Sequence, residues 1–118
     1  MSAILVIDDS QFMRDRCDEL LSPQGYDIYH ASDGLEGVES YKKLKPTLVL
    51  MDMTMPEMDG LSAVREIMKF DPHAKIVMVS AVGQLPVIKK CMESGAKYFL
   101  VKPFDSAKLI EAVKRYCK

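Results

Sequence analysis

The sequence has no surplus of charge of either sign, because 16 Lys and Arg face 17 Asp and Glu for a formal net charge of −1 at pH 7. Binding to a nucleic-acid backbone depends on a strong basic excess, so we expect no nonspecific nucleic-acid binding. Long apolar runs are also missing: stretches such as residues 3–7 fall far short of the ~20 residues that cross a bilayer, and the N-terminus lacks the basic region of a signal peptide. We therefore expect a cytoplasmic protein without a nucleic-acid or membrane partner.

Cysteine is scarce. The three cysteines, Cys17, Cys91 and Cys117, are an odd number at wide spacing, which argues against a disulfide framework and against a zinc site. We expect them to be free thiols, buried or half-buried. Apolar residues make up 48% of the 118 residues, the composition of one soluble domain that leaves no room for a second. The chain is thus expected to form a single domain over residues 1–118.

Five short apolar runs alternate with stretches in which apolar residues have helical spacing. Four of the runs are almost continuously apolar, as expected for strands buried on both faces of a parallel sheet. The second run is mixed, with Asp27 and His30 among its apolar residues, and suits an edge strand. The runs predicted as strands are residues 3–7, 26–31, 48–51, 76–79 and 98–101.

Apolar residues three or four positions apart predict a helix after each strand. Ser10, Asp33 and Ser106 are placed as N-caps of three of these helices. Strict alternation of strand and helix predicts an α/β fold, a doubly wound five-stranded parallel sheet with helices on both faces. From this fold class we infer the strand order 2-1-3-4-5 of flavodoxin-like (βα)5 proteins.

Polar side chains close four of the predicted strands, at the edge where ligands bind in sheets of this kind. Asp8 and Asp9 follow the first strand, Asp52 the third, Ser80 the fourth and Lys102 the fifth. Because the first and third strands are neighbours in the inferred order, the three carboxylates meet in one crevice. Two unit charges about 4 Å apart repel by about 4 kcal/mol at an effective dielectric constant of about 20, so the cluster requires cations. Lys102 supplies one, and Mg²⁺ with oxygen ligands and several waters suits the remaining deficit.

Asp52 is the best candidate nucleophile of this cluster, because Asp8 and Asp9 are paired and better suited to holding a metal. A carboxylate beside Mg²⁺, a lysine and a hydroxyl can attack phosphorus and form an aspartyl phosphate. The metal, Lys102 and a backbone N–H near Ala81 would hold the phosphoryl oxygens. Taken singly, these residues also fit ordinary roles, such as helix capping by Asp8 and Asp9 or a turn at Lys102. Their convergence at one edge of one sheet favours the phosphoacceptor site.

These strand ends and their neighbours resemble the receiver domain of two-component response regulators. The resemblance runs from Ile4 to the last helix, nearly the whole chain, and its motifs are specific in combination. Within the family, Phe12-Met13-Arg14 and residues 80–84 favour the single-domain chemotaxis type, the CheY-like proteins. The motifs are Asp8-Asp9-Ser10, residues 51–60 with Met55-Pro56-Glu57-Met58-Asp59-Gly60, Ser80-Ala81, and Gly95-Ala96 leading to Lys102-Pro103-Phe104.

The resemblance implies that Asp52 accepts a phosphoryl group from a histidine kinase. Asp9, Asp52 and the backbone carbonyl of Thr54 would bind Mg²⁺ directly, and Asp8 would act mainly through a water. Thr54 and Val82 occupy positions that tune the attack of water in this family, so the resemblance leaves the lifetime of the phosphoryl group open.

The resemblance also implies a switch. Ser80 is the hydroxyl that moves toward the phosphoryl oxygens, and Phe99 is the aromatic residue that changes rotamer with it. Lys102 is the phosphate-binding lysine, before a cis Pro103. Ser80 stands where threonine is commoner in the family, which removes a methyl group and keeps the hydroxyl.

Phosphorylation adds about two negative charges, which favours conformers that bring the hydroxyl and the lysine inward. With no output domain expected after Lys118, the signal would pass by protein-protein contact from a monomer to a target such as a flagellar motor switch protein. The chain would catalyse its own phosphorylation and dephosphorylation only, and is not a classical enzyme. An acidic or amphipathic partner segment fits a surface of the fourth helix, fifth strand and fifth helix, with Lys89, Lys90, Tyr98, Lys108 and Lys114 exposed.

Other functions share parts of this pattern. A hydrolase of the haloacid dehalogenase type requires a second Asp where Thr54 stands, and Asp8 and Asp9 would repel the phosphate of a flavodoxin-like flavin. A binding module independent of phosphorylation would not need the full set of site residues. The main alternative is a single-domain phosphorelay intermediate that passes its phosphoryl group to a histidine phosphotransfer protein, because only the partner surfaces differ.

Overall fold

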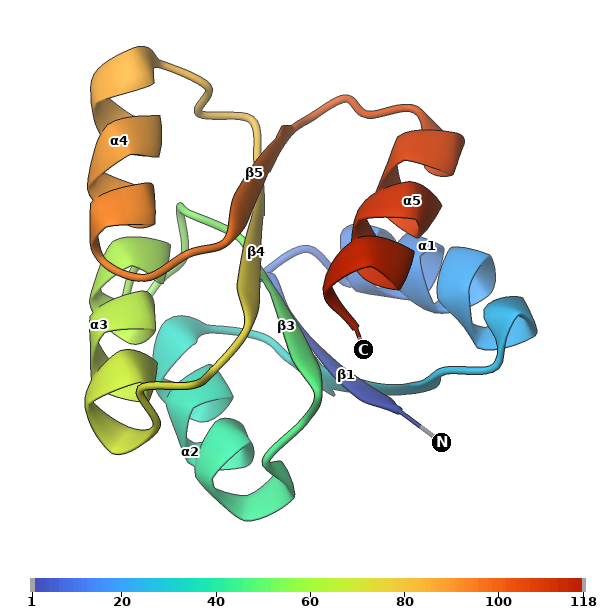
Figure 1. Cartoon of the computed structure of the whole chain (residues 1–118), viewed down its shortest axis with the longest axis horizontal. Coiled ribbons are helices and arrows are strands. Elements are labelled where there is room, and N and C mark those ends of the chain that lie inside the picture. Colours follow the sequence, from blue (N-terminus) through green and yellow to red (C-terminus); the bar gives the residue numbers. More distant parts are fainter. Residues whose placement is uncertain (1, 118) are drawn as a thin grey trace.

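The computed structural model describes residues 2–117. It contains a five-stranded sheet in the order β2-β1-β3-β4-β5, in which every neighbouring pair is parallel (Figure 1). The predicted strand order is therefore confirmed. The strands are β1 (Ala3–Ile7), β2 (Asp27–Ala31), β3 (Leu48–Met51), β4 (Ile76–Ser80) and β5 (Tyr98–Val101).

A helix follows each strand, as predicted. Figure 1 shows α1 and α5 on one face of the sheet and α2, α3 and α4 on the other, which is the doubly wound arrangement. The helices are α1 (Gln11–Leu21), α2 (Gly34–Leu44), α3 (Gly60–Phe70), α4 (Leu85–Glu93) and α5 (Ser106–Tyr116), with a short 3-10 helix η1 (Ser22–Gln24) after α1.

Each face of the sheet has its own hydrophobic core. Ile4 and Val6 of β1 pack in the cluster that includes Leu109 of α5, whereas Leu5 and Ile7 pack in the cluster of α2, α3 and α4. The division follows from the alternation of side chains along a strand. Burial on both faces also explains the continuous apolar runs of β1, β3 and β4.

The helix N-caps confirm two of the three predictions and correct the third. The side chains of Ser10 and Asp33 accept hydrogen bonds from the first turns of α1 and α2. Ser106, by contrast, is the first residue of α5, and the cap is Asp105, whose carboxylate accepts from the Ala107 N–H at 2.8 Å. The adjacent Asp and Ser are both good caps, and the Ser106 hydroxyl is engaged elsewhere.

The sheet has two edges: the apolar pattern identified only β2 as an edge strand, whereas the inferred order 2-1-3-4-5 places β5 at the other edge. β5 is also an edge strand, and its residues Tyr98 and Val101 are 37% and 42% exposed. The prediction that this continuous apolar run is buried on both faces was wrong. Tyr98 instead stacks on Tyr116 of α5, with ring centroids 5.9 Å apart.

All three cysteines are free and buried, as predicted. Across residues 2–117, none of the helices has the length and apolar character needed to traverse a lipid bilayer.

Candidate functional site

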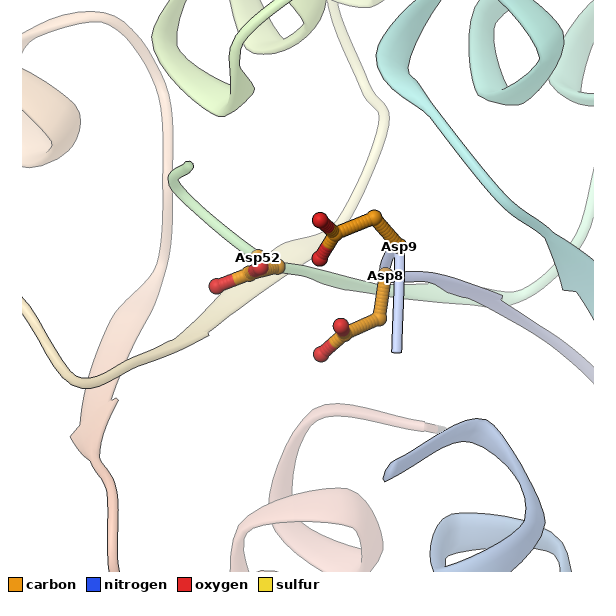
Figure 2. A group of neighbouring side chains, drawn as sticks. All are labelled: Asp8, Asp9 and Asp52. Carbon is orange, nitrogen blue, oxygen red and sulfur yellow. The ribbon is translucent and has the colours of Figure 1, made fainter. Parts of the chain in front are cut away.

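The carboxyl ends of β1 and β3 bring three carboxylates together. Ile7 pairs with Met51 across these strands, so Asp8 and Asp52, the next residues, leave the sheet side by side. Carboxylate oxygens of Asp8, Asp9 and Asp52 all lie within 4.8 Å of one another (Figure 2). Asp8 and Asp52 are buried, whereas Asp9 is exposed. Residues far apart in the sequence thus form one acidic cluster.

Asp8 is held at four of its atoms. Its Oδ1 accepts from the Ser10 N–H at 2.9 Å, and its Oδ2 accepts from the Lys102 ammonium at 2.8 Å. Its backbone N–H donates to Ala31, and its carbonyl accepts from the Arg14 guanidinium at 2.6 Å. Both carboxylate oxygens are therefore occupied by the protein, which fits a residue that acts on a metal through water.

The surroundings of Asp52 disfavour its ionised form. Burial raises the pKa of Asp52 above its ordinary value, and the nearby charge of Asp8 raises it further. Lys102, with Nζ 3.6 Å from Asp52 Oδ1, and the Met53 N–H, at 2.9 Å, act in the opposite direction. Ionised Asp52 is thus under-compensated, which is the condition that a further cation would relieve.

Lys102 reaches both carboxylates from the end of β5. Its backbone N–H donates to the Ser80 carbonyl at 2.9 Å, which fixes the start of its side chain beside β4. The lysine side chain is only 17% exposed. The peptide bond between Lys102 and Pro103 is cis.

Ser80 and Phe99, the residues predicted to switch, lie on the neighbouring strands β4 and β5. Ser80 is buried, and its Oγ accepts from the Val82 N–H at 3.1 Å. Phe99 is partly buried against the core of α2, α3 and α4. Ala81, whose N–H is predicted to contact phosphate, is exposed at the end of β4. The movements of these residues remain predictions.

The loop after Asp52 is folded back onto the site by Gly60. The Gly60 N–H donates to the Met53 carbonyl at 2.8 Å, and a Cβ at position 60 would stand 2.1 Å from the Asp52 carbonyl oxygen. Only glycine permits this approach. Thr54, the predicted carbonyl ligand, is exposed in this loop, and its role as a ligand stays a prediction.

Arg14 is a site neighbour that the sequence reasoning missed. In the sequence it belongs to the segment Phe12-Met13-Arg14 that favours the chemotaxis type, and in the structure its guanidinium binds the backbone carbonyl of Asp8. A basic residue in the first turns of the helix that follows an acidic pair was the available signal. Its charge adds to that of Lys102 beside the three carboxylates.

The donor set fits a hard divalent cation. It consists of oxygen atoms only, it carries more negative charge than Lys102 can balance, and Asp52, one of its two buried members, has a raised pKa. Mg²⁺ and Ca²⁺ both take such ligands, and a site that combines few protein oxygens with water favours Mg²⁺. The arrangement therefore suits metal-assisted chemistry at a carboxylate.

Comparisons with known proteins agree with this geometry. The family model described as response regulator receiver domain matches residues 4–114. The chemotaxis protein CheY of Thermotoga maritima is 45% identical over 116 residues, covering 98% of this chain and 97% of that protein. The sporulation initiation phosphotransferase F of Bacillus subtilis is 34% identical over 113 residues, covering 96% of this chain and 91% of that protein.

A solved structure is similar over nearly the whole fold. CheY of Borrelia burgdorferi, in a complex with CheX, BeF3 and Mg²⁺, superposes with a TM-score of 0.94 at 36% identity, covering 99% of this chain and 90% of that chain. The matched span, the strand order and the acidic cluster agree, and the chain belongs to the family of response regulator receiver domains.

Proposed function

We propose that this receiver domain is a phosphorylation-activated signalling switch in which Asp52 accepts a phosphoryl group from a histidine kinase. The observation that carries the proposal is the position of Asp52, buried between the carboxylates of Asp8 and Asp9 and the ammonium of Lys102. An ionised carboxylate with too little positive charge around it attracts a cation and can act as a nucleophile toward phosphorus. The cation and the lysine then hold the phosphoryl oxygens.

Phosphoryl transfer to Asp52 exchanges one bond to phosphorus for another. An Asp52 carboxylate oxygen bonds to phosphorus as the bond from phosphorus to the kinase imidazole nitrogen breaks, and that nitrogen keeps the electron pair. The product is an acyl phosphate on Asp52. In dephosphorylation, water attacks phosphorus, inorganic phosphate leaves, and the carboxylate is regenerated.

Bound Mg²⁺, held by Asp9, Asp52 and the Thr54 carbonyl with Asp8 acting through water, would neutralise the charge of the phosphoryl oxygens.

The other contacts to the phosphoryl group come from residues of this chain. Lys102 turns its ammonium from Asp8 toward a phosphoryl oxygen, and the Ala81 N–H donates to another. The Ser80 hydroxyl, whose oxygen accepts from the Val82 N–H, moves to donate its proton to a phosphoryl oxygen, and Phe99 changes rotamer as the hydroxyl moves. Only conformers with these groups inward satisfy the added charge, so their population rises.

We further propose a chemotaxis-type role, with output through a surface of α4, β5 and α5 to a protein such as a flagellar motor switch component. The support is a set of exposed cations on this surface, together with a hollow of about 110 Å³ beside the stacked Tyr98 and Tyr116. An acidic or amphipathic segment matches this chemistry. The exposed lysines are Lys89, Lys90, Lys108 and Lys114.

The second candidate function is a phosphorelay intermediate that passes the phosphoryl group to a histidine phosphotransfer protein. Its support is the similarity to a sporulation phosphotransferase and the strong exposure of Phe12, at 75%, on the first turn of α1 beside the site. The site chemistry is the same in both functions. Transfer from the labelled chain to a histidine phosphotransfer domain, followed by gel assay, would distinguish them.

The test of the phosphoacceptor is intact-mass spectrometry after incubation with acetyl phosphate and Mg²⁺. We expect one phosphoryl adduct in the wild-type chain, and none in an Asp52→Asn variant or in the presence of EDTA. An adduct that survives in the variant would assign the acceptor to another residue. Absence of any adduct in the wild-type chain would favour a binding module independent of phosphorylation.

A further inference from the structure

Helices α1 and α5 lie together on one face of the sheet (Figure 1) and are joined by one charged hydrogen bond. Nη2 of Arg16, on α1, donates to Oγ of Ser106, the first residue of α5, at 2.9 Å. The bond is partly buried and connects residues 90 positions apart. A charge-assisted bond sheltered from water is stronger than an exposed one. It is a specific tie between the first and last helices.

A second tie joins the same two segments of the chain. Lys102, the residue after β5, binds Asp8, the residue after β1, with Nζ 2.8 Å from Oδ2. These two interactions and the chain segments between them, residues 8–16 and 102–106, form a closed loop of contacts. Cys17 follows Arg16 in α1, and burial raises the pKa of its thiol to about 12; the charge of Asp8 also raises this pKa, whereas Lys102 and Arg16 act in the opposite direction.

The segment between the two ties carries the lysine of the site. The Lys102 backbone is fastened to Ser80, and Phe104 packs against the core of α1 and α5. The Arg16 bond then fixes where this segment enters α5. Loss of that bond frees this segment at its α5 end and so loosens Lys102, whereas Asp8 and Asp52 keep the backbone hydrogen bonds that place them at the ends of β1 and β3.

We propose that Arg16 and Ser106 are positioning residues for phosphoryl transfer at Asp52. Their hydrogen bond fastens the N-terminus of α5 to α1 and so fixes the reach of the Lys102 ammonium between Asp8 and Asp52. The inference rests on the proposed function of Asp52. It assigns a role in the reaction to two residues that touch neither the phosphoryl group nor the metal.

The test compares rates of Asp52 phosphorylation by acetyl phosphate at saturating Mg²⁺ in the full chain. Ser106→Ala and Arg16→Gln are each expected to lower the rate constant about 3- to 10-fold, since small misplacements of a catalytic group have effects of this size or larger. The double variant should lose no more than either single variant, because both changes remove the same bond. Ser106→Thr keeps the hydroxyl and should restore the rate.

Mg²⁺ affinity, measured by calorimetry without a phosphodonor, separates positioning from general damage. It should stay within twofold of wild type in all variants, because Asp8, Asp9 and Asp52 are untouched. A matched control is Ser94→Ala: the Ser94 hydroxyl accepts from Arg65 Nε at 3.4 Å at the C-cap of α4, on the other face of the sheet. That variant should be phosphorylated at the wild-type rate.

Three outcomes overturn the inference. One is a wild-type rate in both Ser106→Ala and Arg16→Gln. Another is a double variant whose loss is the product of the single losses. The third is a fall in Mg²⁺ affinity equal to the fall in rate. A wild-type chain that acquires no adduct would instead refute the proposed function, and this inference with it.

Discussion

Lys102 stands closer to Asp8 than to Asp52: its Nζ lies 2.8 Å from Asp8 Oδ2 and 3.6 Å from Asp52 Oδ1. The ammonium therefore balances the charge of Asp8 more fully than the charge of Asp52, the proposed phosphoryl acceptor. Asp52 is left with a raised pKa, and its ionised form is costly to the fold until a further positive charge arrives. The same imbalance leads to a prediction about stability.

Replacement of Asp52 by Asn should stabilise the protein in the absence of Mg²⁺. Because the pKa of Asp52 is raised by folding, the folded chain holds a proton that the unfolded chain has released, and stability falls as pH rises between the two pKa values. The gain in Asp52→Asn is thus present at about pH 7 and absent below the ordinary carboxyl pKa of about 4. A gain of about 1 kcal/mol would raise Tm by about 4 °C.

Thermal unfolding followed by circular dichroism at about pH 7 and about pH 3 measures this difference. Added Mg²⁺ should reduce the difference in Tm between the variant and wild type at neutral pH, because Mg²⁺ stabilises the wild-type cluster more than the variant. Equal Tm values for the two chains at neutral pH without metal would contradict the conclusion that ionised Asp52 destabilises the fold.

Tyr41→Phe should lower the stability of the interface between α2 and α3 in a pH-dependent way. The buried Tyr41 hydroxyl donates to Asp71 Oδ2 at 2.8 Å, and this bond is the main reason that the pKa of Asp71 is lowered. A lowered carboxyl pKa gives stability that is present above the unfolded pKa and is lost as pH falls through the folded pKa. The urea midpoint of the variant should therefore be lower at neutral pH and converge with wild type in acid.

An NMR titration of the Asp71 carboxyl provides the direct measurement for this pair. We expect its midpoint to move upward in Tyr41→Phe. The pKa stays below its ordinary value, because the His73 N–H still donates to the other oxygen at 3.0 Å. An unchanged midpoint would mean that the hydroxyl does not hold the carboxylate.

Gly60→Ala should damage both the fold and the site. The new Cβ would overlap the Asp52 carbonyl oxygen, so the start of α3 must shift away from β3. Overpacking of this kind costs about 1–3 kcal/mol, and here it also displaces the loop that carries Thr54. Urea unfolding and Mg²⁺ titration of the variant measure the two effects. Ser62→Ala, at an exposed position of the same helix, is the control and should leave both unchanged.

The thiols should be inert in the native protein. All three cysteines are buried, and burial raises the pKa of each, to about 12 for Cys17. Because the thiolate is the reactive form, a thiol reagent at about pH 8 should label none of them before unfolding and all three in urea. Rapid labelling of one cysteine under native conditions, located by peptide mass mapping, would reveal local opening at that helix.

The order of the elements and the acidic cluster could be predicted because both depend on local patterns. Apolar runs mark the strands, and the carboxyl ends of neighbouring parallel strands must share an edge, which brings Asp8 and Asp52 together. Burial of β5 was predicted wrongly, since an apolar run such as residues 98–101 does not show which strands lie at an edge.

Contacts that depend on the direction of long side chains were out of reach. Arg14 and Arg16 are two positions apart in α1, yet one binds the turn after β1 and the other binds the start of α5. The choice of Asp105 over Ser106 as helix cap has the same origin, because the Ser106 hydroxyl accepts from Arg16. Such partners are set by packing between elements that the sequence separates.

The two-sided core has a consequence for synthesis on the ribosome. The core on the face of α1 contains Leu109 and Val113 of α5, and the ammonium beside Asp52 comes from the residue after β5. The sheet covers part of the apolar face of α1, and the rest is covered only when α5 docks. A nascent chain that ends before β5 has Asp52 but neither this cover nor its lysine. The chain should therefore accept a phosphoryl group only after the last helix has docked, and a chain whose synthesis is incomplete should not be phosphorylated.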